Sequence, residues 1–378
     1  MKQPLQGVRI VDLTRLAPGP YASLALANLG AEVIKIERPR FGDPLRYISR
    51  FGVEGGDLLF ELLNRNKKSM TLNLRAPEGK AILRELTRQA DVLLEGFRPG
   101  VMKRLGLDYG ALAQVNPRLV YASLSGYGQT GPYHLRAGHD LNYIALGGLL
   151  ALTGTKDGPP VIPGVPVADF MGGLWMAFGV LAALFERERS GRGQYLDISM
   201  LNSITALLAI PLAEWLTTGH TPQRGQMWLT GKQACYNVYE TADGKYMALG
   251  ALEPEFWQAF CEAVGRPDWQ ARQHDADQAS LIAEVAALFR TQSRDYWTNL
   301  FANHDCCCEP VLTLDEVFAH PQAMHYQLLH EGELAMPLSS GEAPHLPAPR
   351  LGQHTAEILT TLGYTAADIE RLQQKGII

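Results

Sequence analysis

Short β-rich segments alternate with apolar helical segments over the first 130 residues. Strand patterns occur at 7–13, 31–37, 70–74, 91–96 and 118–128, and helical patterns occur at 21–30 and 76–90. Pro77 lies near the first turn of the second helical segment, where its missing N–H costs least. This alternation predicts an α/β domain in which helices cover a parallel sheet.

Two long apolar helical stretches follow, one after Asp169 and one from about Asn202 to Thr217, with the strand pattern GQYLDISM between them. The longest apolar run extends from Phe170 to Phe185. This run is shorter than the roughly 20 residues that a membrane-spanning helix needs. We therefore expect a buried helix and no membrane partner.

Near residue 220 the apolar helical sequence gives way to the polar segment GHTPQRGQ, a linker pattern that predicts a second, smaller domain after it. From Gln233 the alternation predicts a β-hairpin that turns at 242–244, followed by helical sequence from Glu253 to about residue 325. A Pro- and Gly-rich stretch at 336–352 precedes a helix, TAEILTTLG, that we expect to pack on the first domain. The predicted bounds are 1–218 for the large domain (completed by 336–378), 219–232 for a linker, 233–325 for the small domain, and 326–378 for a second linker and the C-terminal return.

Charge, cysteine usage and missing motifs narrow the function. The 34 basic and 39 acidic side chains give a net charge of −5, which excludes a generally basic nucleic-acid binder but permits a local basic pocket. The cysteines form no CxxC pair, and 306–308 are consecutive, so we expect a reducing compartment and no metal site. The N-terminus lacks a signal-peptide pattern, and we expect a cytoplasmic protein. Neither GxGxxG after the first strand nor GxxxxGK[ST] occurs, so a dinucleotide or nucleoside triphosphate cofactor lacks its usual signature.

Three polar side chains are candidates for chemistry. Asp169 stands at the start of an apolar helix, where it can cap backbone N–H groups or serve as a base or nucleophile beside an apolar pocket, with Gly172 and Gly173 allowing a ligand close approach. His139 is either a hydrogen-bonded structural histidine or a catalyst. Glu253 is either a solvated residue of a first helical turn or a functional group that acts if the second domain folds over the first.

Predicted strand ends lead into glycine or polar turns at 14–15, 96–98 and 126–128, and ligands bind beyond the carboxyl ends of strands in open α/β sheets. Several basic residues lie near predicted strand ends or helix starts. They are either separate surface charges or, if they converge in the fold, a joint binding site for a phosphorylated ligand. These residues are Arg38, Lys67, Lys68, Arg75, Arg98 and Arg104.

Several longer segments match a known family. They are GVRIVDLTRLAPGPYASLALANLGAEVIKIERP, NRNKKSMTLNL, LLEGFRPGVMKRLGL, YASLSGYGQTGPY, AGHDLNY, PVADFMGG and ERERSGRGQYLDISM. On these segments the chain resembles the class III CoA-transferase (CaiB/BaiF) family almost end to end, and within it the α-methylacyl-CoA racemases most closely.

The resemblance implies a doubly wound, Rossmann-like large domain, a smaller α+β domain and an interlocked homodimer with its site between one subunit's large domain and the other's small domain. Asp169 matches the family's catalytic aspartate, His139 the racemase histidine, and Glu253 the glutamate that supports this histidine. The stretches that bind coenzyme A contain Arg38, Leu72, Arg75, Gly96, Phe97, Arg98 and Arg104. Coenzyme A is then part of an acyl-CoA substrate, and no separate cofactor is expected.

Two reactions follow from the resemblance. One is inversion of the α-carbon of a 2-methyl-branched acyl-CoA by His139 and Asp169 acting on opposite faces, with the enolate held by N–H groups at the helix start after Asp169. The other is CoA transfer between carboxylic acids through a thioester on Asp169. Ala17 stands where formyl-CoA transferases carry glutamine, which disfavours an oxalate or formate substrate.

Overall fold

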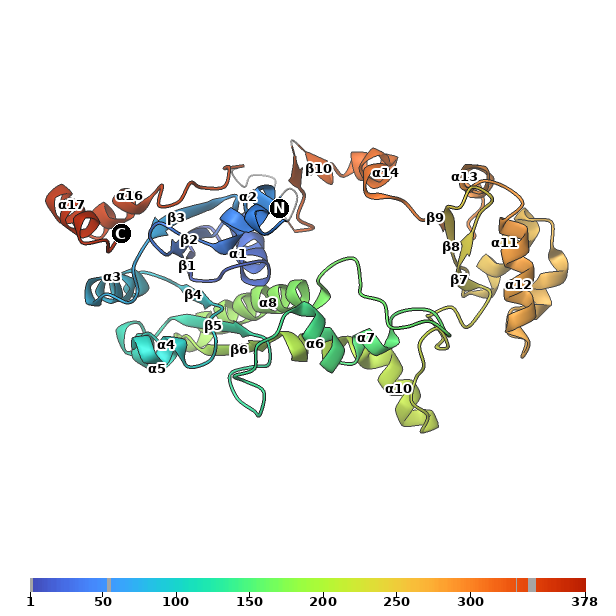
Figure 1. The fold of residues 1–378 in the computed structure, drawn as a ribbon, viewed down its shortest axis with the longest axis horizontal. Helices are drawn as coiled ribbons and strands as arrows, with labels where there is room; N and C mark the ends of the chain where they lie inside the picture. The colour runs from blue at the N-terminus through green and yellow to red at the C-terminus, as the bar shows by residue number, and fades with distance from the viewer. Residues whose placement is uncertain (1–2, 53–55, 331, 339–344) are drawn as a thin grey trace. The chain divides into compact units, whose positions relative to one another are not determined.

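The computed structural model describes residues 3–52, 56–330, 332–338 and 345–378 (Figure 1). Its contacts group the chain into two compact units. The large unit comprises Met1–Gly147, Gly164–Leu207 and Leu328–Ile378, and the small unit comprises Gly148–Pro163 and Leu208–Gln327. The domain bounds given from the sequence stay a prediction beside this grouping.

A six-stranded parallel sheet forms the centre of the large unit, with strand order β3-β2-β1-β4-β5-β6. The strands are β1 (Arg9–Asp12), β2 (Glu32–Glu37), β3 (Lys67–Thr71), β4 (Val92–Glu95), β5 (Val120–Ser125) and β6 (Tyr195–Ser199). The chain order reverses between β1 and β4, and this reversal marks the place where doubly wound sheets bind ligands. The predicted doubly wound α/β fold is confirmed.

Helices cover both faces of this sheet. On one face, α1 (Pro18–Asn28) and α8 (Val167–Ser190) pack against each other and against the strands (Figure 1). On the other face, buried side chains of the strands share one apolar cluster with helices from distant parts of the chain. These helices are α3 (Pro77–Arg88), α4 (Val101–Leu105), α5 (Tyr109–Val115), α16 (Thr355–Thr361) and α17 (Ala366–Gln374). The C-terminal helices α16 and α17 thus pack on the large sheet.

Short elements complete the large unit. They are η1 (Pro44–Phe51), α2 (Gly56–Asn64), α6 (Asp140–Leu146), α9 (Met200–Thr205), η2 (Ala206–Leu208), β10 (Leu329–His330) and β11 (Glu333–Leu334), with the last residue of η2 in the small unit.

The small unit combines an antiparallel sheet, β7-β8-β9, with helices. Strands β7 (Tyr236–Glu240) and β8 (Tyr246–Gly250) form the predicted hairpin, and β9 (Cys308–Pro310) pairs with β8. The core contains Trp257, Phe260 and Phe289. The helices are α7 (Leu149–Leu152), α10 (Ala209–Thr218), α11 (Pro254–Ala263), η3 (Pro267–Arg272), α12 (Gln278–Phe289), α13 (Arg294–Phe301), α14 (Leu314–Ala319) and α15 (Pro321–His325).

Some predicted element bounds were wrong. The strand expected at 70–74 is β3, Lys67–Thr71, because the amine of Lys67 finds buried acceptors on Pro20 and Asn64. The helix expected over 202–217 is interrupted by the turn η2 at 206–208.

The apolar run at 170–185 belongs to a longer helix than expected, the 24-residue α8. By length and composition, α8 and the stretch Met200–Thr218 are each sufficient to cross a bilayer, with mean hydropathies of 1.7 and 1.3. The core helices of soluble proteins pass the same test, so this finding does not change the expected absence of a membrane partner, which stays a prediction.

Candidate active site

Two cavities open in the large unit, each with a volume of about 460 Å³. Pocket A is lined by His139 and Asp169 together with the turns that follow β1, β4 and β5. Pocket B is lined by residues that follow β1, β2 and β3, including Arg38 and Arg75. Thr14, Arg15 and Phe97 line both cavities. The strand-end turns thus build the site, as the sequence predicted.

The residues predicted to bind coenzyme A divide between the two cavities. Pocket B is lined by Arg38, Leu72, Arg75 and Phe97. Pocket A is lined by Gly96, Phe97 and Arg98. Arg104, on α4, is not among the residues that line either cavity.

The two lysines of the predicted basic cluster do not join it. Lys67 is buried, and its amine donates to Pro20 O at 2.9 Å and to Asn64 Oδ1 at 3.0 Å. Lys68 forms ion pairs with Glu32 and Glu357 at 3.0 and 2.8 Å. Of the six predicted basic residues, those that line the cavities are therefore Arg38, Arg75 and Arg98.

His139 is placed by the start of α6. It is the last extended residue before the helix, and its backbone N–H donates to Asn142 Oδ1 at 3.0 Å. Its carbonyl accepts from the backbone N–H groups of Asn142 and Tyr143 at 2.8 and 3.3 Å. The backbone of His139 is therefore fixed, while its imidazole remains exposed in pocket A.

Tyr143 holds the turn that precedes His139. Its hydroxyl donates to Gly138 O at 2.6 Å, and its ring packs edge-on against Tyr127. A Cβ atom at Gly126 would lie 2.5 Å from the Tyr143 ring, and one at Gly138 would lie 2.7 Å away. Glycine at both positions lets the buried ring sit directly beneath the turn.

Asp169 does not cap the helix that it begins. Helix α8 starts at Val167 after Pro166, so Asp169 is its third residue. Asp140 performs the capping, because its Oδ1 accepts from the backbone N–H groups of Ala168 and Asp169 at 2.6 and 3.2 Å. The first amide after Asp169, that of Phe170, donates to Pro166 O at 3.2 Å. The amides expected to bind an enolate thus begin with one that is already bonded within the helix.

The ionisation of Asp169 is shifted toward neutrality. Burial raises the pKa of its carboxyl to about 6, the negative charge of Asp140 adds to this rise, and His139 opposes it. Asp169 can therefore gain and lose a proton near physiological pH, which is what an acid/base group requires.

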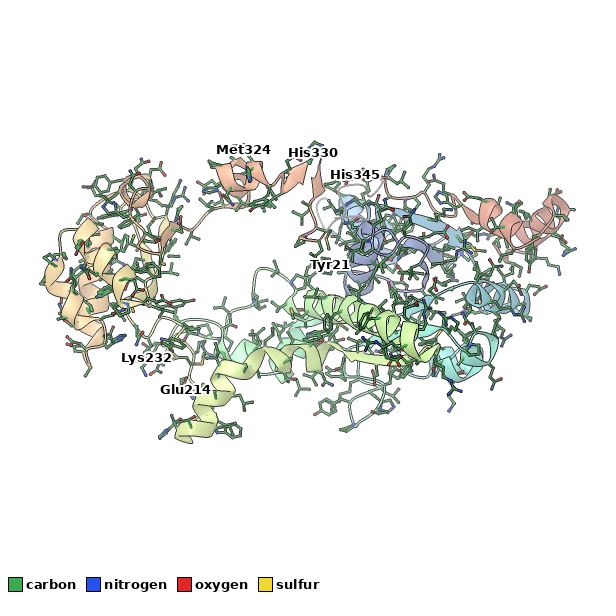
Figure 2. The ribbon with its side chains drawn as sticks, turned by 180° about the vertical axis from the view of Figure 1, so that it is seen from behind. Tyr21, Glu214, Lys232, Met324, His330 and His345 are labelled. Carbon is green, nitrogen blue, oxygen red and sulfur yellow. The ribbon has the colours of Figure 1, made fainter. Side chains whose placement is uncertain are left out.

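The glycine pair behind Asp169 serves helix packing rather than ligand approach. A Cβ at Gly173 would lie 2.4 Å from Pro18 O on α1, and one at Gly172 would lie 2.7 Å from the Met200 side chain. Nearby, Phe170 of α8 meets the ring of Tyr21 of α1, labelled in Figure 2, with centroids 4.9 Å apart.

Glu253 lies in the small unit, immediately before α11, and its side chain is exposed. Its carbonyl accepts from the N–H groups of Phe256 and Trp257 at 3.1 Å, which leaves the carboxylate free of helix capping. Its support of a histidine stays a prediction. Among the residues that the structure describes, no group of three or more His, Cys, Asp or Glu side chains is arranged to hold a metal ion.

Sequence reasoning missed Glu95, the buried last residue of β4. It accepts from the backbone N–H of Phe97 at 2.8 Å and from the hydroxyl of Ser123. Burial raises its pKa to about 7. The signal was an acid at the end of an apolar strand, directly before the 96–98 turn that lines pocket A.

The sequence profile of CoA-transferase family III matches residues 5–355. Alpha-methylacyl-CoA racemase of Homo sapiens is 37% identical over 396 residues, covering 99% of this chain and 97% of that protein. Succinyl-CoA–D-citramalate CoA-transferase of Chloroflexus aurantiacus is 35% identical over 396 residues, covering 100% and 98%. A solved CAIB/BAIF family protein from Brucella suis superposes with a TM-score of 0.81 at 30% identity, covering 96% of this chain and 100% of that one.

Proposed function

Because this chain belongs to CoA-transferase family III, we propose that it inverts the α-carbon of 2-methyl-branched acyl-CoA thioesters. The observation that carries the proposal is the pairing of His139 and Asp169 in one pocket. An imidazole and a carboxyl with a pKa of about 6 form an acid/base pair suited to neutral pH. The 37% sequence identity to the alpha-methylacyl-CoA racemase of Homo sapiens supports the same reaction.

Inversion needs a proton removed from one face of the α-carbon and another delivered to the opposite face. In one direction, neutral His139 accepts the α-proton, and the electron pair of the C–H bond moves into an enolate. Protonated Asp169 then donates its proton to the other face, which leaves an imidazolium and a carboxylate. The reverse direction exchanges these roles, so the pair always holds one proton at the start of a turnover.

The enolate needs positive charge, and the arginines of pocket A supply it. Arg15 and Arg98 line this pocket, and within the described part of the chain neither forms an ion pair. Guanidinium groups that face the reacting thioester stabilise negative charge as it develops. In this proposal the two arginines stabilise the enolate, the role first expected of backbone amides at the start of α8.

Coenzyme A belongs to the substrate in this proposal. Its nucleotide lies in pocket B against Arg38, Leu72 and Arg75, and its thioester reaches pocket A along the wall that the two cavities share. We also propose a homodimer in which Glu253 of the partner subunit orients His139, as the family resemblance implies.

Transfer of CoA between acids is the alternative, which the transferases among the relatives support. In this reaction Asp169 attacks the thioester carbonyl and expels the CoA thiolate. The thiolate then attacks the resulting anhydride at the aspartyl carbonyl, which releases the acid and leaves CoA on Asp169. His139 has no required proton transfer in this scheme.

The test supplies one enantiomer of a 2-methylacyl-CoA in D₂O without an acceptor acid and follows the α-proton by NMR. Deuterium at the α-carbon of intact thioester, with loss of optical purity, supports inversion. Absence of exchange, with CoA appearing on an added carboxylic acid, would replace inversion by transfer.

A further inference from the structure

In the segment Thr14–Leu16, Thr14 and Arg15 line both cavities and Leu16 lines pocket A. Charged side chains that have no contact with solvent hold this segment. We call this segment the shared loop. Lys35 and Asp43 form an ion pair of 2.8 Å in which both side chains are 0% exposed. Lys35 Nζ donates to Thr14 O at 3.0 Å, and Asp43 Oδ1 accepts from Leu16 N–H at 3.2 Å. One ion pair therefore fixes the shared loop at two points.

Buried charge also holds the remaining polar groups of Thr14. Asp12 Oδ1 accepts from the Thr14 backbone N–H at 2.8 Å and from its hydroxyl at 2.5 Å. Lys67 Nζ lies 3.9 Å from Asp12 Oδ2, so a second buried pair lies beside the first. The N–H, carbonyl and hydroxyl of Thr14 thus each bond to a buried charge.

The conformation of the shared loop requires such support. Leu16 has a φ of 64°, in the left-handed region that costs a residue with a Cβ roughly 1–2 kcal/mol. Gly19 of α1 approaches Thr14 so closely that a Cβ there would lie 2.1 Å from the Thr14 Cβ. Local sequence preference does not favour this shape, and it persists because the surrounding contacts impose it.

An ion pair is a poor choice if stability alone were the purpose. Desolvation offsets most of the attraction between buried charges, and apolar replacements of both partners are often neutral or stabilising. The retained pair has directional hydrogen bonds to the loop that apolar side chains cannot make. What the Lys35–Asp43 pair provides, and an apolar pair would not, is therefore a fixed geometry of the wall between the two cavities.

We propose that Lys35 and Asp43 are positioning residues, which hold the shared loop so that a thioester reaching from pocket B lies between His139 and Asp169 in pocket A. This inference rests on the proposed function, since it assigns the acyl-CoA to these cavities. Misplacement of a reacting group by about 1 Å can cost about a hundredfold in rate. Lys35 and Asp43 also belong to the lining of pocket B, but their side chains have no exposed surface that free CoA could contact. The binding of free CoA, through Arg38 and Arg75, is therefore expected to depend much less on the pair than kcat does.

The test replaces both charges with apolar residues, in Lys35→Met/Asp43→Leu, because Lys35→Met alone would leave a buried carboxylate without its partner. Arg187→Met is the matched control, since Arg187 is a buried, ion-paired cation of the same unit that lines neither cavity. Three quantities are measured: the rate constant kcat for α-deuterium exchange, the Kd of free CoA, and amide hydrogen exchange in a peptide covering 13–17.

The double variant is expected to lose about a hundredfold in kcat, to bind free CoA within about threefold of the wild type, and to exchange the Leu16 amide faster. The control is expected to match the wild type in all three. Retained kcat, or unchanged amide exchange at 14–16, would overturn the assignment, and so would loss of protection over the whole large unit. If the wild-type protein shows no α-exchange, inversion fails. The rate of CoA transfer to an added acid then replaces the exchange rate in this comparison, and amide exchange at 14–16 still reports whether the ion pair holds the shared loop.

Discussion

The side chain of Asp140 bonds to the backbone of Asp169, with Oδ1 3.2 Å from its amide nitrogen. Two carboxylates therefore meet at the start of α8, and Asp140 holds the position where the positive end of the helix dipole favours an anion. Asp169 receives burial and the repulsion of Asp140 instead, which raise its pKa to about 6. The arrangement ties the Asp140 side chain to the start of α8 and raises the pKa of Asp169 toward the range that proton transfer requires.

Asp140→Asn should shift the pH profile of the reaction. The amide oxygen still accepts from the α8 backbone, but the negative charge that raises the pKa of Asp169 is gone. We expect the limb of kcat/KM that follows Asp169 to move to lower pH, whether Asp169 acts as the base or the acid. Exchange rates measured for both enantiomers between about pH 4 and 9 check this, with Asp157→Asn as the control. If this limb of the pH profile stays at the same pH, it does not report the ionisation of Asp169.

His139→Ala should reduce α-proton exchange by about 10²–10⁴-fold, the usual contribution of a positioned acid/base group. His134→Ala is the matched control, because His134 lines the same pocket and its Nδ1 is engaged with Gly131 O. The control should stay within about threefold of the wild type in the NMR assay. Equal losses in both variants would show a general effect of the pocket's charge, and no loss in His139→Ala would favour CoA transfer.

Gly126→Ala should destabilise the large unit by about 1–3 kcal/mol, the usual cost of overpacking. The added methyl would meet the Tyr143 ring at 2.5 Å and disturb the hydrogen bond that holds the turn before His139. Gly164→Ala is the control, because a Cβ there meets no atom within 4 Å. Urea unfolding measures the stability difference, and kcat in the same preparations measures the effect on the turn. Wild-type values in both would contradict the role given to Tyr143.

Glu95→Gln should change how stability depends on pH. The folded-state pKa of Glu95 is raised to about 7, above its ordinary 4.5, so between these values the folded protein holds a proton that the unfolded chain releases. Wild-type stability should therefore fall as pH rises from about 4.5 to 7, with a loss of about 3 kcal/mol that is complete above pH 7.

Glutamine keeps an acceptor for the Phe97 amide and carries no charge, so this loss should disappear in the variant. Unfolding free energies at pH 4.5 and 8 for wild type, Glu95→Gln and the surface control Glu85→Gln check the difference. A parallel pH dependence in wild type and Glu95→Gln would assign the effect to another group.

Five of the six strands of the large sheet were predictable because each contains Val, Ile, Leu or Tyr in a short run, and three of them, β1, β4 and β5, lead into the turns at 14–15, 96–98 and 126–128. Strand β3 was misplaced because it begins with Lys67, Lys68 and Ser69, which read as a polar turn. Their partners lie far away in sequence: the Ser69 hydroxyl donates to Glu37 and accepts from the amide of Gly352. The local sequence around β3 cannot indicate partners that are so distant along the chain.

The sequence predicted some residues of the site but not the contacts that hold them. The meeting of His139 and Asp169 followed from family resemblance, and the strand-end rule placed the turns that surround them. Of the two interpretations left open for Asp169, capping is excluded, because the cap of α8 comes from Asp140. Asp140 accepts from amides 28 and 29 residues away, and Glu95 accepts from the Ser123 hydroxyl 28 residues away, so these contacts became visible only in the fold.

The wall common to the two cavities also limits how this enzyme can diversify. Thr14, Arg15 and Phe97 line both cavities. If the acyl group occupies pocket A and coenzyme A pocket B, as proposed, a substitution in this wall changes the binding of both. Adaptation to a new acyl chain is freer at residues that line pocket A alone, such as Leu124 and Met200. Selection for new substrates should therefore leave the wall unchanged and accumulate its changes on the far side of pocket A.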